Sequence, residues 1–297
     1  MVDGFAECVH IIPLGHEYDR AVRPFDTAFV NRVYLVVDTG EGTSSGKSKR
    51  DQAMDKEQKE NYTPRVTQYF NERGVEVRIV ETQTFDLEKL LITLTSLIRL
   101  EKEKGNLVYL NMSSSGRLVA VGAYLAAAAY NIPTYYVSSD YFAKDETERR
   151  EHGVSVCTSN KSLFLPNFKF DRPNDAEEVI LKKLYSVKEM NEYETGVSSM
   201  ELVSCLEEKS VSGFIAKKNL DESTSDHTTS DQRNENSRRL MRLSIIMDKL
   251  VNKDNYVIST KEGRKVKYKI NSLGEHAVCL CGMERGKYAE MFGENRG

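Results

Sequence analysis

The sequence lacks several features that would assign it to a familiar class of protein. No run of apolar residues approaches the length that a membrane-spanning helix needs. The opening residues, MVDGFAECVHIIPL, contain no basic segment, so we expect no signal peptide. The five cysteines are scattered and odd in number, which argues against a disulfide framework. We therefore expect a cytoplasmic protein.

Patterns typical of metal sites and catalytic centres are also missing. His276, Cys279 and Cys281 fall within one predicted helix, where their side chains cannot all face one ion, and no second cysteine pair follows. We predict no metal site and no cofactor. Neither a Ser/His/Asp nor a Cys/His arrangement can be argued from spacing, because such triads are assembled in space.

The chain is long enough for two domains, and its composition is that of a polar globular protein. It has 297 residues, of which 39% are hydrophobic and 29% charged. A chain of this length can bury two separate apolar cores.

The first part of the chain alternates apolar strand-like runs with helical segments. This alternation predicts an α/β fold with an open, mostly parallel, Rossmann-like sheet over residues 1–173. Two further short runs are expected to pair as an edge hairpin that closes this domain, and residues 40–61 are either a loop or a solvated helix. The predicted main strands are Cys8–Leu14, Arg32–Asp38, Val75–Glu81, Leu107–Asn111 and Pro133–Ser138, and the hairpin strands are Val154–Cys157 and Leu163–Phe170.

Residues 174–297 have the element order of a winged helix–turn–helix. A helix capped by Asn174 or Asp175 is followed by helices over Ser199–Glu208 and Ser237–Val251. A hairpin of Tyr256–Thr260 and Lys265–Ile270 comes next, and a last helix follows it. Residues 219–235 have no apolar residue after Leu220, so we expect them to be disordered.

The stretch Leu107–Tyr130 predicts a ligand site. Its strand-like run ends at Asn111, and Ser113-Ser114-Ser115-Gly116-Arg117 then opens a helix, which is where backbone N–H groups and the helix dipole favour an anion. The simpler interpretation is a strand-to-helix connection whose serines only cap the helix. Parallel sheets bind ligands beyond the carboxyl ends of their strands. The turn after the first strand lies at that edge and offers Gly15, His16, Asp19 and Arg20.

Positive charge is concentrated on the third helix and the hairpin of the second domain. Residues 236–270 contain ten Lys or Arg and three Asp or Glu, a balance of +7, whereas residues 171–235 contain eight and fifteen, a balance of −7. Such a concentration suits contact with DNA phosphates. The predicted DNA contacts are Arg238, Arg239 and Arg242 on the helix and Lys261, Arg264, Lys265 and Lys267 on the wing. The alternative is a wing that binds protein.

These segments resemble a known family. The chain is similar to archaeal regulators that join a CARF domain (CRISPR-associated Rossmann fold) to a C-terminal winged helix–turn–helix. The resemblance spans nearly the whole chain. It is carried by HIIPLGHEYDRAVRPF, by NMSSSGRLVAVGA and by RRLMRLSIIMDKLVNKDNYVISTKEGRKVKYKINSLGEHAV.

The resemblance implies a homodimer with a cyclic oligoadenylate across its twofold axis, because one set of residues can then read both halves of a symmetric ring. The residues it implies as contacts are Asn111, Ser113, Ser114, Ser115, Gly116 and Arg117, with Gly15 and Asp19 beneath the ring.

Two functions of different classes follow. The first is a ligand-responsive transcriptional regulator that binds double-stranded DNA. The second is a metal-independent ring nuclease, in which Ser114 and Arg117 would position and stabilise the reacting phosphate. A regulator that senses another nucleotide or anion is a third possibility.

Overall fold

The structure is a computed structural model that describes residues 5–40, 49–168, 171–190, 196–215, 228–263 and 265–293. The chain divides into two compact units. The first comprises Met1–Asp171 together with Gly282–Gly297, and the second comprises Arg172–Cys281. The last residues therefore return to the first unit, whereas the sequence analysis assigned them to the second domain.

The first unit is built on a six-stranded sheet in the order β3-β2-β1-β4-β5-β8. The first five of these strands are parallel, which confirms the predicted α/β sheet, and β8 runs antiparallel to β5. The strands are β1 (Cys8–Pro13), β2 (Arg32–Asp38), β3 (Glu76–Thr82), β4 (Leu107–Asn111), β5 (Thr134–Val137) and β8 (Ser162–Leu165).

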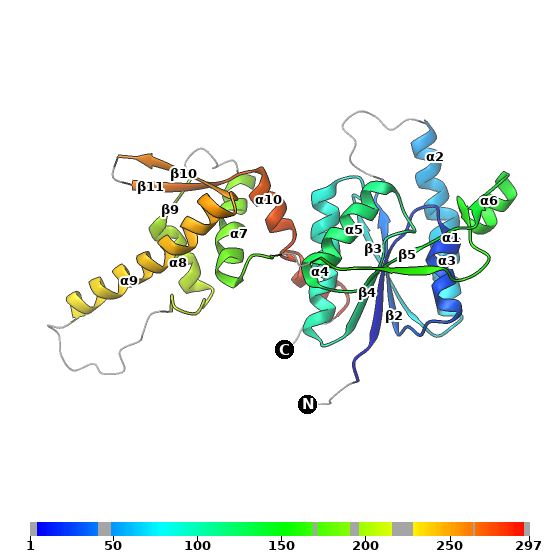
Figure 1. Ribbon diagram of the computed structural model, residues 1–297, viewed down its shortest axis with the longest axis horizontal. Helices are drawn as coiled ribbons and strands as arrows, with labels where there is room; N and C mark the ends of the chain where they lie inside the picture. The colour runs from blue at the N-terminus through cyan, green and yellow to red at the C-terminus, as the bar shows by residue number, and fades with distance from the viewer. Residues whose placement is uncertain are drawn as a thin grey trace. The chain divides into compact units, whose positions relative to one another are not determined.

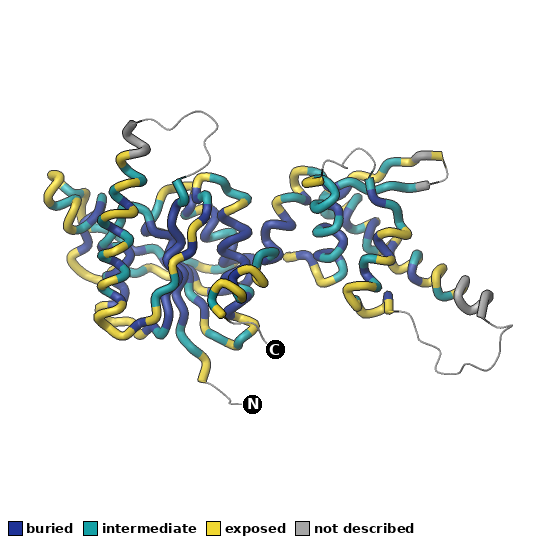
Figure 2. The backbone as a smooth tube through the Cα atoms, turned by 180° about the vertical axis from the view of Figure 1, so that it is seen from behind, coloured by how far each residue is buried: buried dark blue, intermediate teal, exposed yellow. Residues whose placement is uncertain are grey.

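Helices cover both faces of this sheet, as Figure 1 shows. The helices α4 (Leu87–Glu103) and α5 (Arg117–Tyr130) lie on one face, and α1 (Tyr18–Val22) and α3 (Thr63–Asn71) lie on the other. The central strands are buried along most of their length (Figure 2), as expected for continuous apolar runs between two helical layers. The side chain of Asp86 caps α4 by accepting hydrogen bonds from the backbone N–H groups of Glu88 and Lys89.

The predicted edge hairpin does not form. The short strand β7 (Ser155–Val156) pairs with β6 (Tyr141–Phe142), while β8 extends the main sheet beside β5. The helix α6 (Glu146–His152) lies between β6 and β7 in the sequence. A short strand gains more by covering the open edge of a large sheet than by pairing with another isolated strand.

The segment before β3 is helical from residue 49. The helices α2 (Lys49–Glu57), η2 (Gln58–Tyr62) and α3 follow one another directly. Gln58 and Tyr62 are buried, so this helix packs on the unit and is not fully solvated.

The second unit contains α7 (Asp175–Glu189), α8 (Ser199–Glu208) and α9 (Thr228–Asp248), followed by the π-helix η3 (Lys249–Lys253). Its three-stranded sheet has the order β10-β11-β9, and α10 (Ser272–Cys279) ends the unit. The strands are β9 (Val197–Ser198), β10 (Val257–Glu262) and β11 (Lys265–Ile270). Residues 228–235 are helical, so that part of the predicted disordered segment is corrected, while residues 219–227 lie outside the described residues.

After the second unit the chain re-enters the first through Gly282 and α11 (Arg285–Met291). The helix α11 packs on α4, and Tyr288 is 2% exposed there. The backbone N–H of Glu284 donates to the hydroxyl of Ser96 at 3.0 Å. Within the described residues, no helix combines the length and the apolar character needed to cross a membrane.

Candidate functional site

Two turns predicted to share an edge of the sheet are joined in the structure. The strands β1 and β4 are neighbours, and the backbone N–H of Gly15 donates to the carbonyl oxygen of Ser114 at 2.7 Å. A Cβ atom at position 15 would lie 3.2 Å from both Cα and Oγ of Ser115. Glycine is therefore the residue that lets the turn after β1 approach the turn after β4.

Three of the predicted ligand contacts support the β4 turn from inside. Asn111, Ser113 and Ser114 are all buried. The Asn111 side chain accepts hydrogen bonds from the N–H and hydroxyl of Ser113 at 2.9 and 2.7 Å. The hydroxyl of Ser114 donates to the carbonyl oxygen of Pro13 at 2.9 Å. These side chains satisfy one another or the backbone, and their expected role as direct ligand contacts stays a prediction.

The burial of Ser114 also bears on the ring nuclease hypothesis. Its hydroxyl already bonds to backbone and is not among the groups that line the cavity described below. Arg117 is exposed and likewise absent from the described lining. The role of these two side chains in cleavage therefore stays a prediction.

Asp19, another predicted ligand contact, is also buried and bonded within the first unit. Its carboxylate accepts a hydrogen bond from the backbone N–H of Cys157 at 2.9 Å, and Oδ2 lies 3.1 Å from Nδ1 of His152. Burial raises the pKa of Asp19 above its ordinary value, although the Cys157 N–H and the nearby Arg23 oppose this rise. Asp19 thus links α1 to the end of α6 and to the segment after it, and it is not part of the described cavity lining.

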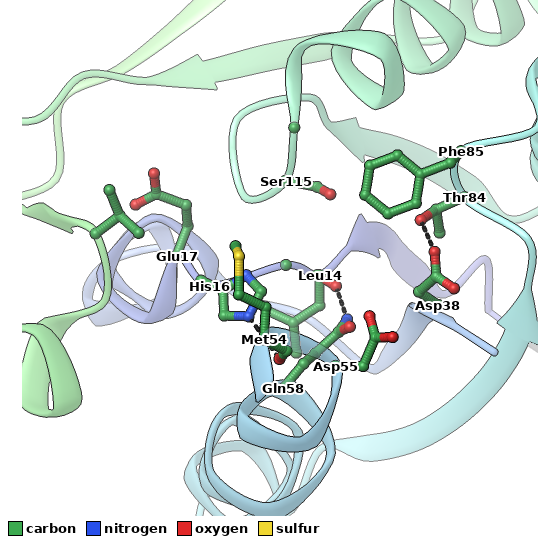
Figure 3. Close-up of a pocket in the computed structure, with 13 residues that line it drawn as sticks. Leu14, His16, Glu17, Asp38, Met54, Asp55, Gln58, Thr84, Phe85 and Ser115 are labelled. Carbon is green, nitrogen blue, oxygen red and sulfur yellow. Dashed lines mark hydrogen bonds between the residues drawn. The ribbon is translucent and has the colours of Figure 1, made fainter. Parts of the chain in front are cut away.

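A cavity of about 560 Å³ opens at the carboxyl edge of the sheet (Figure 3). Gly15, Ser115 and Gly116 line it, so the two joined turns form one of its walls. The opposite wall comes from the ends of β2 and β3 and from α2 and η2. The full lining is Leu14, Gly15, His16, Glu17, Asp38, Met54, Asp55, Gln58, Thr84, Phe85, Ser115, Gly116 and Val154.

Several lining residues were not predicted from the sequence. The carboxylate of Asp38 accepts a hydrogen bond of 2.5 Å from the hydroxyl of Thr84, and Phe85 follows directly. Asp38 ends one parallel strand and Thr84 follows its neighbour, so the rule that sheets bind ligands at their carboxyl edge could have identified both. The sequence did not indicate that α2 and η2 line the cavity, because residues 40–61 were also compatible with a loop.

The polar groups of this cavity are mostly acceptors. Its lining includes the carboxylates of Glu17, Asp38 and Asp55, and no Lys or Arg belongs to the described lining. Burial raises the pKa of Glu17, and hydrogen bonds from Ser155 and the charge of Arg20 oppose that rise. The cavity interior therefore favours a neutral group that donates hydrogen bonds over a phosphate.

The rim of the cavity carries positive potential, in contrast to the acceptor groups of the interior. The helix α5 begins at Arg117, and within the described part of the chain no side chain caps it at Gly116. Its first backbone N–H groups and Arg117 provide positive potential beside the cavity wall formed by Ser115 and Gly116. An anion is favoured at this rim.

The predicted DNA contacts of α9 separate into two kinds. Arg238 and Arg242 are exposed, and Arg242 donates to the carbonyl oxygen of Gly213. Arg239 is 6% exposed and lies 3.3 Å from Glu207 and 3.6 Å from Glu235. Arg239 is therefore largely buried in the second unit, and its expected contact with DNA stays a prediction.

The residues predicted to contact DNA from the hairpin of β10 and β11 are described only in part. Lys261 is exposed and Lys267 is half-buried. Arg264 and the side chain of Lys265 lie outside the described residues. Among the residues that are described, no group of His, Cys, Asp and Glu side chains could hold a metal ion.

Comparison with known proteins gives one family match and several structural ones. Residues 8–141 match the family described as "HFX_2341_N:-like, N-terminal". A search of curated proteins gives no match.

The similar solved structures include Enterococcus italicus Csm6 bound to cyclic hexa-2'-fluoro-hexa-dAMP. That match has 12% identity and a TM-score of 0.37 over 83% of this chain and 56% of Csm6. Sulfobacillus thermosulfidooxidans Can2 in complex with cyclic tetra-adenylate matches with 15% identity and a TM-score of 0.33, over 44% and 32%. Protein VC1899 from Vibrio cholerae matches with 14% identity and a TM-score of 0.36, over 97% and 69%. The chain thus spans about half of Csm6 and a third of Can2.

Proposed function

We propose that this chain is a ligand-responsive transcriptional regulator that binds a nucleotide in its first unit and double-stranded DNA through its second. The observation that carries the proposal is the presence, in one chain, of a ligand-sized cavity on a Rossmann-like sheet and a separate unit of three helices and a three-stranded sheet. Ligand cavities at this edge are typical of parallel α/β sheets.

The arrangement of the second unit supports a winged helix–turn–helix. The hairpin of β10 and β11 is extended by β9, which precedes α8, through the pairs Lys267↔Ser198 and Tyr268↔Val197. This connection places the hairpin at the edge of a small helical core. In this proposal α9 is the recognition helix and the hairpin is the wing. The exposed residues Arg238, Arg242 and Lys261 meet phosphates or base edges.

The chemistry of the cavity supports a ligand that combines a base with a phosphate. The ring of Phe85 is largely exposed at the cavity, where it can stack on a base. The carboxylates of Asp38 and Glu17 can accept hydrogen bonds from an exocyclic amino group. A phosphate would then lie at the rim formed by Gly116 and Arg117.

A cyclic oligoadenylate has both of these parts, and it is the ligand that the resemblance to CARF regulators implies. A symmetric ring suits two copies of the chain related by a twofold axis. Leu118 and Val121, beside Arg117 on α5, are exposed apolar residues that a second copy could bury. We therefore propose a homodimer with the ring between its two copies.

The path of the chain supports coupling between the two functions. The second unit is inserted between β8 and α11 of the first, so both of its ends are anchored there. The helix α11 packs on α4, which begins just after the cavity residues Thr84 and Phe85. A ligand that shifts the start of α4 can in this way act on α11, the helix that follows the second unit in the chain.

The test of ligand binding is calorimetric titration of the purified chain with cyclic tetra-adenylate, with linear tetra-adenylate as a control. We expect tight binding of the ring. Phe85→Ala should weaken binding about tenfold or more, because one base–aromatic stack is removed. Phe142→Ala, which removes an equally exposed phenylalanine on β6, should leave binding unchanged.

The test of DNA binding is selection from a random duplex library, with and without the ring. We expect a preferred sequence whose affinity changes when the ring binds and falls steeply with salt. A chain that selects no DNA under either condition would not be a DNA-binding regulator. Chromatography of the ring after incubation also reports cleavage, and repeated turnover to linear products would support the ring nuclease instead.

A further inference from the structure

The outward face of α9 carries two exposed apolar residues beside its arginines. Met241 is 70% exposed and Ile245 is 69% exposed. They lie four residues apart and therefore on the same side of the helix, together with Arg238. Leu243 and Met247, two positions further along in each case, are buried on the opposite side. The two exposed side chains thus play no part in the core of the second unit.

This composition differs from that of a surface that binds only phosphates. Phosphate oxygens are bound by Lys, Arg and neutral donors, and neither a thioether nor a branched alkyl chain offers a donor. The floor of the major groove, however, presents one apolar group, the C5-methyl of thymine. The flanking positive charge of Arg238 and Arg242 complements DNA and supports duplex DNA as the occupant of this face.

We propose that Met241 and Ile245 read thymine methyl groups in the major groove and so set part of the base preference of this protein. The inference rests on the proposed function as a DNA-binding regulator. The two residues are about 6 Å apart along the helix axis. Successive base pairs are about 3.4 Å apart, so the thymines they contact lie one or two steps from each other.

The experiment uses the full-length chain and the best duplex selected from a random library. Each thymine of that duplex is replaced in turn by uracil, which removes the methyl group and keeps the base pairing. We expect two positions where the replacement weakens binding roughly fourfold, the effect of one buried methyl group. Fluorescence anisotropy measures each dissociation constant.

The variants assign each thymine to a side chain. Met241→Ala should abolish the uracil effect at one of the two positions, and Ile245→Ala should abolish it at the other. Met190→Ala removes an equally exposed methionine at the end of α7, and both effects should persist in that variant. All three residues are on the surface, so their replacement leaves the core intact.

The outcomes distinguish the inference from the proposed function. If the wild-type chain selects no DNA, the proposed function fails. If it binds DNA but tolerates uracil everywhere, or if both uracil effects persist in Met241→Ala and Ile245→Ala, only the inference is overturned. It is also overturned if these variants convert a dimer into a monomer in sedimentation experiments without altering base preference, because the face would then bind a second copy of the chain.

Discussion

The hydrogen bond of 2.7 Å from Gly15 to Ser114 fixes the two turns that form one wall of the cavity. A side chain at position 15 would press on the backbone of Ser115. We expect Gly15→Ala to cost about 1–3 kcal/mol of stability, as overpacking usually does. The β4 turn should shift as a result, and binding of cyclic tetra-adenylate should weaken.

Thermal unfolding and calorimetric titration check this prediction together. Gly286→Ala is the matched control, because a Cβ atom there meets nothing within 4 Å. The control should keep the ligand affinity and keep or slightly raise the melting temperature, because alanine favours a helix. A Gly15→Ala chain that behaves like the control would mean that the close approach of the two turns does not shape the cavity.

The burial of His10 leads us to expect that stability depends on pH. Its ring stacks on Tyr109, Nδ1 lies 3.0 Å from the hydroxyl of Tyr135, and burial lowers the pKa of His10 to about 3. The unfolded chain binds a proton near pH 6.5, whereas the folded chain does not until about pH 3. Stability from this residue is therefore complete above pH 6.5. It is lost as the pH falls from 6.5 towards 3, by about 1.4 kcal/mol per pH unit between these two values.

A double variant isolates this effect. His10→Phe with Tyr135→Phe removes both partners of the hydrogen bond and keeps the aromatic packing. Denaturant unfolding between pH 6.5 and 5 should show a smaller loss of stability in the double variant than in the wild type. Tyr135→Phe alone keeps the histidine and should keep the steep dependence. Equal slopes in all three chains would contradict the prediction.

We expect the neutralisation of Glu101 to lower the stability of the first unit. It is fully buried in α4, and burial alone would raise its pKa, but its hydrogen bonds and the charge of Lys104 outweigh burial and lower that pKa. Its partners are Tyr34 at 2.5 Å, Asn106 at 2.6 Å, Lys104 at 2.9 Å and Arg32 at 3.1 Å.

We expect Glu101→Gln to lower the free energy of unfolding by about 1.5–3 kcal/mol, because Arg32 and Lys104 each lose a charged hydrogen-bond partner, although Arg32 keeps Glu7 and Glu76. Glu103→Gln, two residues further along the same helix, breaks only partly exposed pairs with Arg99 and Arg285 and should cost under about 1 kcal/mol. Chemical denaturation measures both values. Similar losses of unfolding free energy in the two variants would show that the burial of Glu101 does not determine the cost of replacing it.

The sequence was a good guide to the sheet and a poor guide to which side chains face the cavity. The parallel strands could be predicted because each is a continuous apolar run followed by helical periodicity. The pairing of β8 could not, because a strand of four residues can pair with either neighbour and the whole sheet decides. Ser114 points inwards and Ser115 lines the cavity, and nothing in a run of three serines distinguishes them before the turn is folded.

Tyr288 joins α11 to α4 and the end of β3 within the first unit. Its hydroxyl lies 3.3 Å from that of Thr93 on α4, and Thr93 in turn donates to the hydroxyl of Thr82 at the end of β3. We expect Tyr288→Phe to cost about 1 kcal/mol of stability and to reduce the effect of the ring on DNA affinity. Affinity for the ring itself should change little.

The comparison for Tyr288 is Tyr124→Phe. That variant also removes one tyrosine hydrogen bond, from Tyr124 to the carbonyl oxygen of Pro166, but on α5. DNA affinity is measured by anisotropy with and without saturating cyclic tetra-adenylate in both variants. Coupling that survives Tyr288→Phe unchanged would exclude the contact between α11 and α4 as its route.

Arg238 and Arg239 are neighbours in the sequence, but we expect their replacement to change different properties, DNA affinity in one case and stability in the other. Arg238 is exposed on α9, so Arg238→Ala should weaken DNA binding severalfold and reduce the salt dependence by about one ion. Its melting temperature should not change. Arg239 is buried against Glu207 and Glu235, so Arg239→Ala should lower the stability of the second unit by about 1–3 kcal/mol.

Arg238→Lys keeps the positive charge but removes the planar guanidinium, so it distinguishes the effect of charge from that of two parallel hydrogen bonds. It should retain most of the affinity if the residue meets a phosphate, and it should lose selectivity if the residue meets guanine, which arginine binds through two hydrogen bonds. Anisotropy titrations at several salt concentrations, run beside thermal melts, measure all three variants. If Arg239→Ala kept its melting temperature and lost DNA binding, the side chain would belong to the DNA face. Its pairing with Glu207 and Glu235 would then have no structural role.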